Sequence, residues 1–537
     1  MLCVLCGWIL AACAAQLTPL PTVPPTPTNP PILQSTNSPA PPPTAVLTQP
    51  EINICLSVEP QTLYRFARPE LGRHHILAAL EDEVLIQPPS LEVEMVTVRA
   101  SEQVVDGLGR VQAATPGLVL TLLGGEVRVL EEAAEWPLPQ MRVRFTLRPG
   151  LQWSDGAPLT AADFVLGFET ARAADSFDAR RTAGERTASF RVVSETEVEW
   201  LGLPGYITSD YAANLWPPLP AHQFANQTAA EIAASEGANR APLSYGPFQL
   251  IEWRAGEFIR MERNPFYWRA AEGLPYLQSV VFRFDAQNCD VIPSGQTAQT
   301  GELEDWRIEE TTDTRTDYLH FNLALAQFAD GRVRQALGTC AKGDPSSASR
   351  VLDELGWVDG NVDGVREQNN QTLAFSLSLS PQANAALAQN FLACGVSVNV
   401  QTLTEGEWLA DWPSGVVFGR RFELALVTWP LINQRFPCEV WQTEQMASEA
   451  NPAGVNVSGY SNAEFDAACR RVQTALDKET LAAWEAQARA IIERDAPAVE
   501  VGRSTRAAYV RPGVSGVQFS ASAASELWRL EEVLIAP

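Results

Sequence analysis

The chain has 537 residues, 39 prolines and a formal net charge of −25. A body this acidic repels phosphate backbones, which argues against DNA or RNA as a partner. Lys342 and Lys478 are the only lysines, and neither lies in the Gly-Lys-Ser/Thr context of a nucleotide-binding P-loop.

The first fifty residues differ in composition from the rest of the chain. They contain no Asp, Glu, Lys or Arg, and twelve of the 39 prolines lie between Pro19 and Pro50. Such a segment cannot bury a core, so residues 14–50 are predicted to form an extended, partly polyproline II tether. At about 3.1 Å per residue this tether would reach up to ~100 Å.

A short apolar stretch precedes the tether and ends in Leu10-Ala11-Ala12-Cys13. This pattern resembles the bacterial lipoprotein signal, whose cysteine is acylated and becomes the first residue of the mature protein. The resemblance implies a signal peptide over residues 1–13, with palmitate or a similar lipid on Cys13. It places the body outside the cytoplasm, anchored to the cell membrane. No Lys or Arg precedes the apolar stretch, unlike an ordinary signal, and the alternative is an apolar tail with a chance cysteine.

Six cysteines remain in the body, an even number that allows fifteen disulfide pairings outside the cytosol. The pair Cys438–Cys469 is favoured because the loop between them is rich in Asn, Gly and Ser. Cys394 is predicted on a helix face as a buried free thiol. No Cys-x-x-Cys pattern exists among the body cysteines and histidines are few, so no metal site and no cofactor are expected. The adjacent pair His74-His75 is interpreted as part of a surface loop.

Strand-like and helix-like segments alternate in the first part of the body. Residues 141–147 alternate apolar and polar side chains, which predicts a strand. Thr160 and Asp163 form a capping box that begins a helix to about residue 174. The further elements expected in chain order are a hairpin over 248–253 and 258–262, a strand over 280–284, a helix over 330–337 and a helix over 345–356.

The clearest unit is a strand over 373–379, a helix over 382–393 and a strand over 396–400. This βαβ order is typical of parallel sheet. Residues 422–429 predict another buried strand. A second capping box at Ser461-Asn462-Ala463-Glu464 begins one helix, and Leu481, Trp484, Ala488 and Ile491 follow at helical spacing in another. The predicted class is α/β with mixed sheets.

Several stretches together resemble the extracellular solute-binding proteins of family 5, the peptide- and nickel-binding components of ABC transporters. The stretch from Val143 to Phe164, which includes Trp153-Ser154-Asp155-Gly156, is similar to the family's signature. From its residue types alone, each motif is interpreted as structural, such as a turn or a helix cap. The motifs therefore indicate the family but do not identify the ligand-binding residues. Further matches in the family's order are Val58–Leu63, Tyr245–Phe248, Arg263–Trp268, Phe321-Asn322, Asp330–Leu337, Leu352–Trp357 and Asp363–Arg366.

The resemblance implies an α/β, two-lobed periplasmic-binding-protein-like fold of type II, similar to cluster C, with mixed sheets. It implies a non-enzymatic monomer that captures a peptide-like or other small polar solute between the lobes. The protein would deliver this solute to an ABC permease and its ATPase subunits. The expected domains are a signal (1–13), a tether (14–50), a first lobe (51–285, with an extra subdomain at about 60–235), a second lobe (286–498) and a return segment (499–537) that completes the first lobe.

The chain departs from the family's peptide-binding members after the strand that ends at Trp429. In those members an Asp shortly after this Trp holds the ligand's α-ammonium, whereas Trp429 is followed by Pro430-Leu431-Ile432-Asn433. This difference argues against ordinary recognition of a peptide terminus. The stretches after Phe284 and after Leu337 are also shorter than usual, which predicts a trimmed second lobe and a more open cleft.

The candidate ligand contacts lie around the matched strand and in one turn. Trp429 is chosen by its position in the strand, and Tyr245 by its place in a hinge-proximal turn. Asn433 and Arg435 follow Trp429 in a loop and offer polar groups. Trp441 flanks the same strand, where aromatic rings suit stacking on a solute. Core packing or an ordinary loop position is the alternative for each of these residues.

Two other functions remain open. A ligand sensor or degenerate member of the fold, which does not transport, is suggested by the missing Asp and the shortened lobe. A secreted enzyme is less favoured, because no Gly-x-Ser-x-Gly, His-Glu-x-x-His or Cys/His signature is present. A carboxylate pair for glycoside hydrolysis would have to be found among 64 acidic residues.

Overall fold

The computed structural model describes residues 51–536, except 69, 71, 133–134, 174–175, 177–180, 286, 297–302, 304, 381–386, 411, 431–434, 450, 452–453, 521–522 and 524. The body, from Gln49 to Pro537, forms one compact unit. The predicted signal, the lipidation site Cys13 and the tether all lie outside the described residues, as does Asn433. Among the described helices, none has both the length and the apolar character needed to cross a bilayer.

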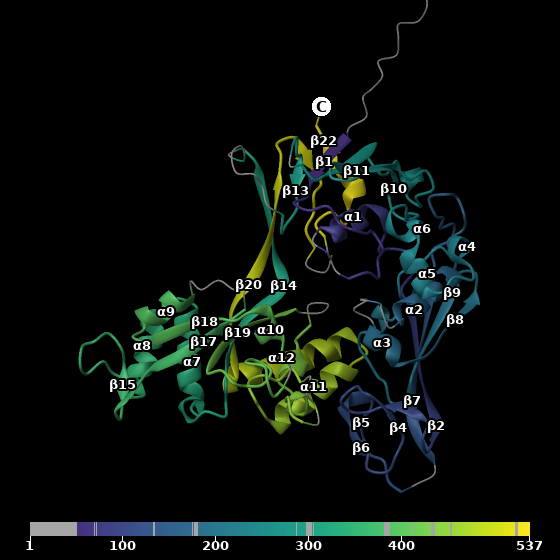
Figure 1. Cartoon of the computed structure of the whole chain (residues 1–537). Helices are drawn as coiled ribbons and strands as arrows, with labels where there is room; N and C mark the ends of the chain where they lie inside the picture. Colours follow the sequence, from purple (N-terminus) through teal and green to yellow (C-terminus); the bar gives the residue numbers. More distant parts are fainter. Residues whose placement is uncertain are drawn as a thin grey trace, which may run out of the picture. The chain divides into compact units, whose positions relative to one another are not determined.

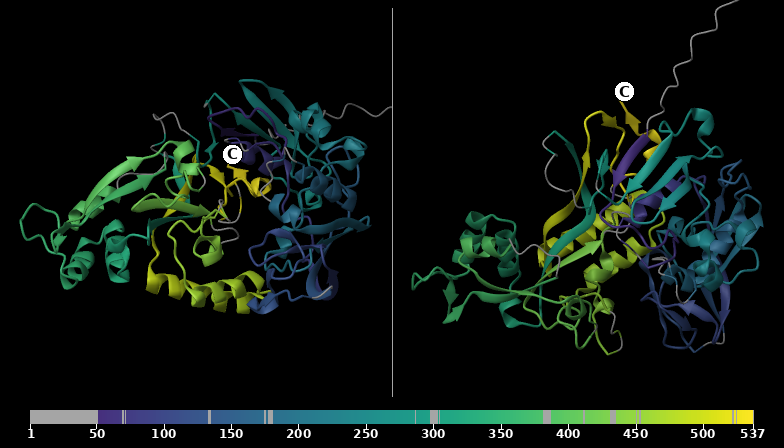
Figure 2. Two further views of the ribbon diagram at one scale, coloured as in Figure 1. Left: turned by 60° about the horizontal axis from the view of Figure 1, so that its bottom comes forward. Right: turned by 45° about the horizontal axis from the view of Figure 1, so that its top comes forward.

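A ten-stranded mixed sheet runs through the body (Figure 1). Its two longest strands, β14 (Arg307–Phe321) and β20 (Ala498–Val510), are antiparallel neighbours over most of their length (Figure 2). The sheet order is β10 (Phe248–Arg254), β11 (Phe258–Arg263), β12 (Ser279–Arg283), β1 (Glu51–Cys55), β13 (Val291–Ile292), β20, β14, β19 (Leu424–Pro430), β17 (Ala374–Leu379) and β18 (Ser397–Thr402).

A second sheet and several short hairpins complete the strands. The four-stranded sheet has the order β2 (Ser90–Arg99), β7 (Glu135–Thr146), β9 (Glu197–Gly202) and β8 (Thr187–Ser194). The hairpins are β3 (Gln103–Val105) with β4 (Val111–Ala113), β5 (Val119–Thr121) with β6 (Val127–Val129), β15 (Glu367–Gln368) with β16 (Gln371–Thr372), and β21 (Val514–Ser515) with β22 (Leu534–Ile535).

The α-helices are distributed along the whole described body. They are α1 (Arg73–Leu80), α2 (Ala161–Ala171), α3 (Arg181–Glu185), α4 (Ala221–Phe224), α5 (Ala229–Ala234), α6 (Glu236–Asn239), α7 (Gly331–Ala341), α8 (Pro345–Glu354), α9 (Leu387–Ala393), α10 (Glu405–Leu409), α11 (Ala463–Thr474) and α12 (Lys478–Asp495).

The buried apolar side chains fall into two groups, which define two lobes. One group comes from residues 52–292 and is completed by Val510–Val533 near the C-terminus. The other comes from residues 318–501. We call residues 51–292 and 510–536 the first lobe and residues 318–501 the second lobe. Strands β14 and β20 run from one to the other, which is the arrangement that allows two lobes to move about a hinge.

Local sequence signals correctly place several helix starts. The Asp163 carboxylate accepts from Thr160 N at 2.6 Å, which closes the predicted capping box of α2. Asp330 caps α7 through Arg332 N at 2.8 Å, although the helix runs to Ala341 and not only to residue 337. For α11 the N-cap is Asn462 and not Ser461.

The predicted parallel unit is also present. Strands β17 and β18 pair in parallel, with α9 between them in the chain, although residues 381–386 lie outside the described part. The two short hairpins β3–β4 and β5–β6 were not predicted. The interpretation of His74-His75 as a surface loop is wrong, because both residues belong to α1 and His75 is completely buried.

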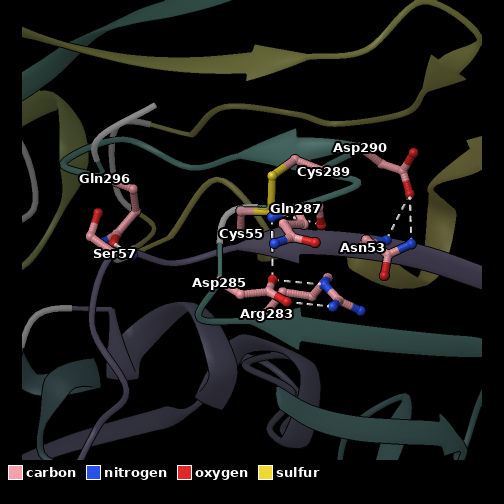
Figure 3. The surroundings of a disulfide bond; sticks show 9 residues. All are labelled: Asn53, Cys55, Ser57, Arg283, Asp285, Gln287, Cys289, Asp290 and Gln296. Carbon is pink, nitrogen blue, oxygen red and sulfur yellow. Dashed lines mark hydrogen bonds and ion pairs between the residues drawn. A yellow bond between two sulfur atoms is a disulfide. The ribbon is translucent and has the colours of Figure 1, made fainter. Parts of the chain in front are cut away.

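Three disulfides join the six body cysteines. Cys438 is bonded to Cys469, the pair favoured from the sequence. Cys394 is not a free thiol, because it is bonded to Cys340 and so ties α9 to α7. The third bond joins Cys55, at the end of β1, to Cys289 (Figure 3). Beside it the Asp290 carboxylate accepts from Asn53 N at 2.7 Å, which fixes the segment after Cys289 against β1.

Candidate functional site

Trp429 lies near the end of β19, opposite Thr316 of β14. Its side chain is half-buried between two apolar clusters of the second lobe. The indole Nε1 donates a hydrogen bond to Nε2 of His320 at 3.0 Å. The ring of Trp429 is therefore held in one orientation.

His320 passes this hydrogen bond on through the core. Its Nδ1 lies 2.8 Å from the Ser458 hydroxyl, which itself donates to the carbonyl oxygen of Pro497 at 2.9 Å. Because the single hydroxyl hydrogen of Ser458 is used there, Nδ1–H donates to Ser458 and Nε2 accepts from Trp429. Burial lowers the pKa of His320 to about 3, so the imidazole is neutral and this tautomer is kept.

Trp441, predicted as a ligand contact, lies in the core of the second lobe instead. It is 0% exposed and stacks between His320 and Phe436, with centroid distances of 6.4 Å and 5.3 Å. Tyr318 meets the same ring edge-on at 5.2 Å. The large apolar area of an indole favours such burial. Trp441 therefore supports Phe436 rather than presenting a surface to a solute.

A cavity of about 820 Å³ lies between segments of the two lobes. Its size is within the range of about 300–1,000 Å³ that is usual for small-ligand sites. Arg435 and Phe436 line it on the second-lobe side. The other lining segments are 105–109, 121, 186 and 205–210 from the first lobe, and 437–439, 442, 445, 455 and 472–474 from the second.

The two lobes contact each other beside this cavity. The Arg435 guanidinium donates to the Ser209 hydroxyl and, at 3.0 Å, to the Ser209 carbonyl oxygen. Ser209 N in turn donates to the carbonyl oxygen of Gln473 at 3.1 Å. Nearby, a Cβ added at Gly125 would lie 2.7 Å from Cγ of Arg471, so the turn after β5 packs closely on α11.

Acidic groups from both lobes border the cavity as well. Asp106 of the first lobe is buried and accepts from Arg110 Nε at 2.9 Å. Glu444 of the second lobe is not a lining residue itself but directly precedes the lining residue Gln445; burial and the charges of Asp466 and Asp106 raise its pKa, against the opposing effect of Arg470. Glu439 also has a raised pKa because neighbouring atoms displace water, although its side chain remains exposed. The walls thus offer cationic and anionic groups together.

Tyr245 lies elsewhere in the first lobe. It is 7% exposed, meets Trp153 edge-on at 5.4 Å and borders a separate cavity of about 640 Å³. The structure therefore does not bring Tyr245 to the cavity that Arg435 lines. Trp429 is not among the residues lining that cavity either, and Asn433 is outside the described part of the chain.

Sequence reasoning missed Ser209, Gln473 and Phe436. Ser209 lies 226 residues from Arg435, in a region with no recognisable motif, so no local signal marks it. Phe436 directly follows Arg435, but its neighbour Trp441 gave the stronger aromatic signal. These residues come together only because of the way the two lobes pack. A sequence pattern within one segment contains no information about that packing.

A family model described as "Bacterial extracellular solute-binding proteins, family 5 Middle" matches residues 130–341. The oligopeptide-binding protein AppA of Bacillus subtilis is 24% identical over 62% of this chain and 70% of its own length. A probable deoxycholate-binding periplasmic protein of Escherichia coli, YgiS, is 25% identical over 74% of this chain and 84% of its own. These relatives are named for binding and not for catalysis, in agreement with the expected non-enzymatic function.

The solved structure of HbpA2 from Haemophilus parasuis shares the fold, with a TM-score of 0.62 and 14% identity over 91% of this chain and 100% of that chain. Its similarity extends over both lobes and not only over the segment matched by the family model. Residues 130–341 are therefore similar to family 5 extracellular solute-binding proteins, and the described body has the two-lobed periplasmic-binding-protein fold.

Proposed function

We propose that this chain is a lipid-anchored extracytoplasmic protein that captures a peptide-like or other small polar solute and delivers it to an ABC permease. The observation that carries the proposal is the cavity of about 820 Å³ with walls from both lobes. A site split between two lobes couples binding to lobe closure, because a solute that contacts both walls stabilises the closed state. A permease can then distinguish the loaded protein from the empty one.

The chemistry of the walls favours a solute with both hydrogen-bonding and apolar parts. Arg435 now donates to a neutral serine of the other lobe, and a solute carboxylate would be a stronger acceptor for its guanidinium. Phe436 adds an apolar surface whose position is fixed by stacking on Trp441. Trp429 and Tyr245 do not line this cavity, so contact between them and a solute is proposed only on their positions in the chain, as it is for Asn433.

The composition of the N-terminal segment supports the anchoring part of the proposal. An acylated Cys13 followed by an uncharged, proline-rich tether would hold the acidic body away from the membrane surface. Replacement of Cys13 by Ser in the full chain should move the protein from the membrane fraction to the soluble fraction. Retention of the Cys13→Ser variant in washed membranes would contradict lipid anchoring while leaving solute binding open.

Native mass spectrometry of the purified protein tests capture, because a co-purified solute appears as a fixed mass increment. The identified solute should raise the melting temperature of the wild type, and Arg435→Gln should reduce that increase. Arg332→Gln is a matched control, since Arg332 pairs with Glu354 on an exposed surface of α7 and α8. A solute that binds but is not taken up by cells would identify a sensor. Failure of peptides, other polar solutes and metal chelates to shift the melting temperature would contradict the proposal.

A further inference from the structure

A second cavity, of about 510 Å³, lies within the second lobe between α7, α12 and β20. Residues 498–503 of β20 form its floor, together with the rings of Tyr318 and Phe436. One wall consists of one face of α7 and the residue that follows the helix, and its side chains are Gln335, Thr339 and Lys342. The other wall belongs to α12 and consists of Arg489, Ile492 and Glu493. We call this cavity the β20 groove.

The floor of the β20 groove is an open strand edge. Residues 498–503 pair with β14 on one side. On the other side β13 pairs with β20 only at Tyr509 and Val510, and no strand in the described part of the chain pairs with 498–503 there. Backbone groups alternate between the two edges of a strand, so alternate N–H and C=O groups of this stretch face the groove. An unpaired edge of this kind is a template for an added strand.

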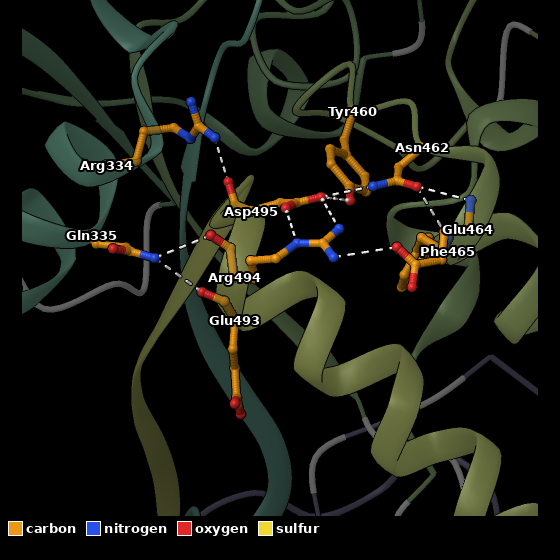
Figure 4. A network of polar contacts seen from close by, with 9 residues as sticks. All are labelled: Arg334, Gln335, Tyr460, Asn462, Glu464, Phe465, Glu493, Arg494 and Asp495. Atoms are coloured by element: carbon orange, nitrogen blue, oxygen red, sulfur yellow. Dashed lines mark hydrogen bonds and ion pairs between the residues drawn. The ribbon is translucent and has the colours of Figure 1, made fainter.

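The groove is closed at one end by a link between its walls. The Gln335 side-chain amide donates to the carbonyl oxygens of Glu493 and Arg494 at 3.3 and 3.1 Å (Figure 4). In the same view Arg334 reaches the main chain of Asp495. These bonds hold α7 against the C-terminal turn of α12, so the width of the groove is set by the fold and not by a ligand.

The walls carry more unpaired positive than negative charge. Arg503 pairs with Glu500 at 2.9 Å. Lys342 and Arg489 have no carboxylate within salt-bridge distance in the described structure, and the Arg489 guanidinium lies over the ring of Phe436 at 5.1 Å. Among the described acidic residues that line the groove, Glu500 has an ion pair and Glu493 has none. In a chain with a net charge of −25, this local excess of cations favours an anionic ligand.

We propose that the β20 groove binds a short, free, acidic peptide in extended conformation. Its main chain would add as a strand to residues 498–503, and its carboxylates would lie toward Lys342 and Arg489. Six strand residues span about 20 Å, and the groove volume is within the range of about 300–1,000 Å³ of small-ligand sites, so both dimensions suit about three to five peptide residues. The inference goes beyond the proposed function, because this site shares only Phe436 with the cavity between the lobes.

Hydrogen–deuterium exchange on the full-length protein tests the inference with the capped peptide Ac-Val-Glu-Glu-Val-NH₂ as the probe, because consecutive side chains of a strand point to opposite faces and so reach both walls. The acidic peptide should slow exchange in residues 498–503, and Ac-Val-Lys-Lys-Val-NH₂ should not. Methylation of alternate peptide nitrogens on the pairing edge should abolish the effect. Equal protection by the basic peptide would overturn recognition by charge. Full protection by the methylated peptide would overturn strand addition.

Charge variants provide the second arm. Lys342→Glu should weaken binding of the acidic peptide by about fivefold, since an exposed charge pair is worth up to ~1 kcal/mol. Lys478→Glu changes the same residue type at an exposed position and should leave the affinity unchanged. Equal weakening by both variants would overturn the site. Protection confined to residues 205–210 and 435–445 would also overturn the proposed site. The peptide would then be a solute of the cavity between the lobes, which the Arg435→Gln variant tests separately.

Discussion

Replacement of His320 by Gln should flatten the pH dependence of the stability of the second lobe. His320 is fully buried, and its neutral ring links Trp429 to Ser458. Protonation would place a hydrogen on Nε2, where the Trp429 N–H already points, and would leave a charge in an apolar core. The folded state therefore resists protonation that the unfolded chain accepts readily.

The size of the effect follows from the two pKa values. The folded-state pKa is about 3, and the ordinary value is 6.5. Because the unfolded chain binds the proton first, the contribution of His320 is complete above about pH 6.5 and is lost as the pH falls toward 3. Between pH 7 and pH 5 this loss is roughly 2 kcal/mol.

Native-state hydrogen exchange of β14 measures this quantity in the lobe concerned. After correction for the intrinsic exchange rate, the opening free energy of residues 316–321 should fall by roughly 2 kcal/mol more in the wild type than in His320→Gln between pH 7 and pH 5. His222→Gln is the control, because His222 is an exposed histidine that pairs with Asp155 in the first lobe. A wild-type slope that His320→Gln leaves unchanged would refute the buried neutral histidine.

Three further changes test separate parts of the structure. Trp429→Phe leaves Nε2 of His320 without its donor and should lower the free energy of unfolding of the second lobe by about 1–3 kcal/mol, measured by urea denaturation; an unchanged midpoint would contradict the hydrogen-bond chain. The double change Cys438→Ser and Cys469→Ser opens a loop with a sequence separation of 31 and should lower the free energy of unfolding by roughly 3–4 kcal/mol, measured by urea denaturation. An unchanged free energy of unfolding in this double variant would contradict a stabilising role of the disulfide. Gly167→Ala should lower the melting temperature, since a Cβ there would overlap the carbonyl oxygen of Pro217 and overpacking costs about 1–3 kcal/mol; an unaffected melting temperature would mean that α2 packs more loosely.

Features that depend on neighbours along the chain could be predicted from the sequence. The cap of α7 by Asp330 and the parallel pairing of β17 with β18 each follow from a few consecutive residues with a clear pattern. The helix end was less well predicted, because α7 continues past residue 337 where its buried face meets β20. Packing of that face, and not helix propensity, decides its length.

Features that depend on distant segments could not be predicted. Cys394 looked like a free thiol because its partner, Cys340, lies 54 residues away on another helix. Trp429 lies in β19 and Trp441 follows that strand, yet the ring of Trp441 is fully buried and that of Trp429 is only half-buried. Arg435, a predicted ligand contact, lines the cavity between the lobes, but its partner Ser209 belongs to the other lobe and could not be predicted from a local pattern. Each of these outcomes is set by tertiary packing.

If one solute is held by both lobes at once, its binding must protect both walls of the cavity together. Hydrogen–deuterium exchange with the solute identified by native mass spectrometry measures this protection. We expect simultaneous protection of residues 105–109 and 205–210 in the first lobe and of residues 435–439 in the second, the segments that line the cavity. Protection limited to one lobe, or protection of neither despite saturating solute, would contradict capture between the lobes.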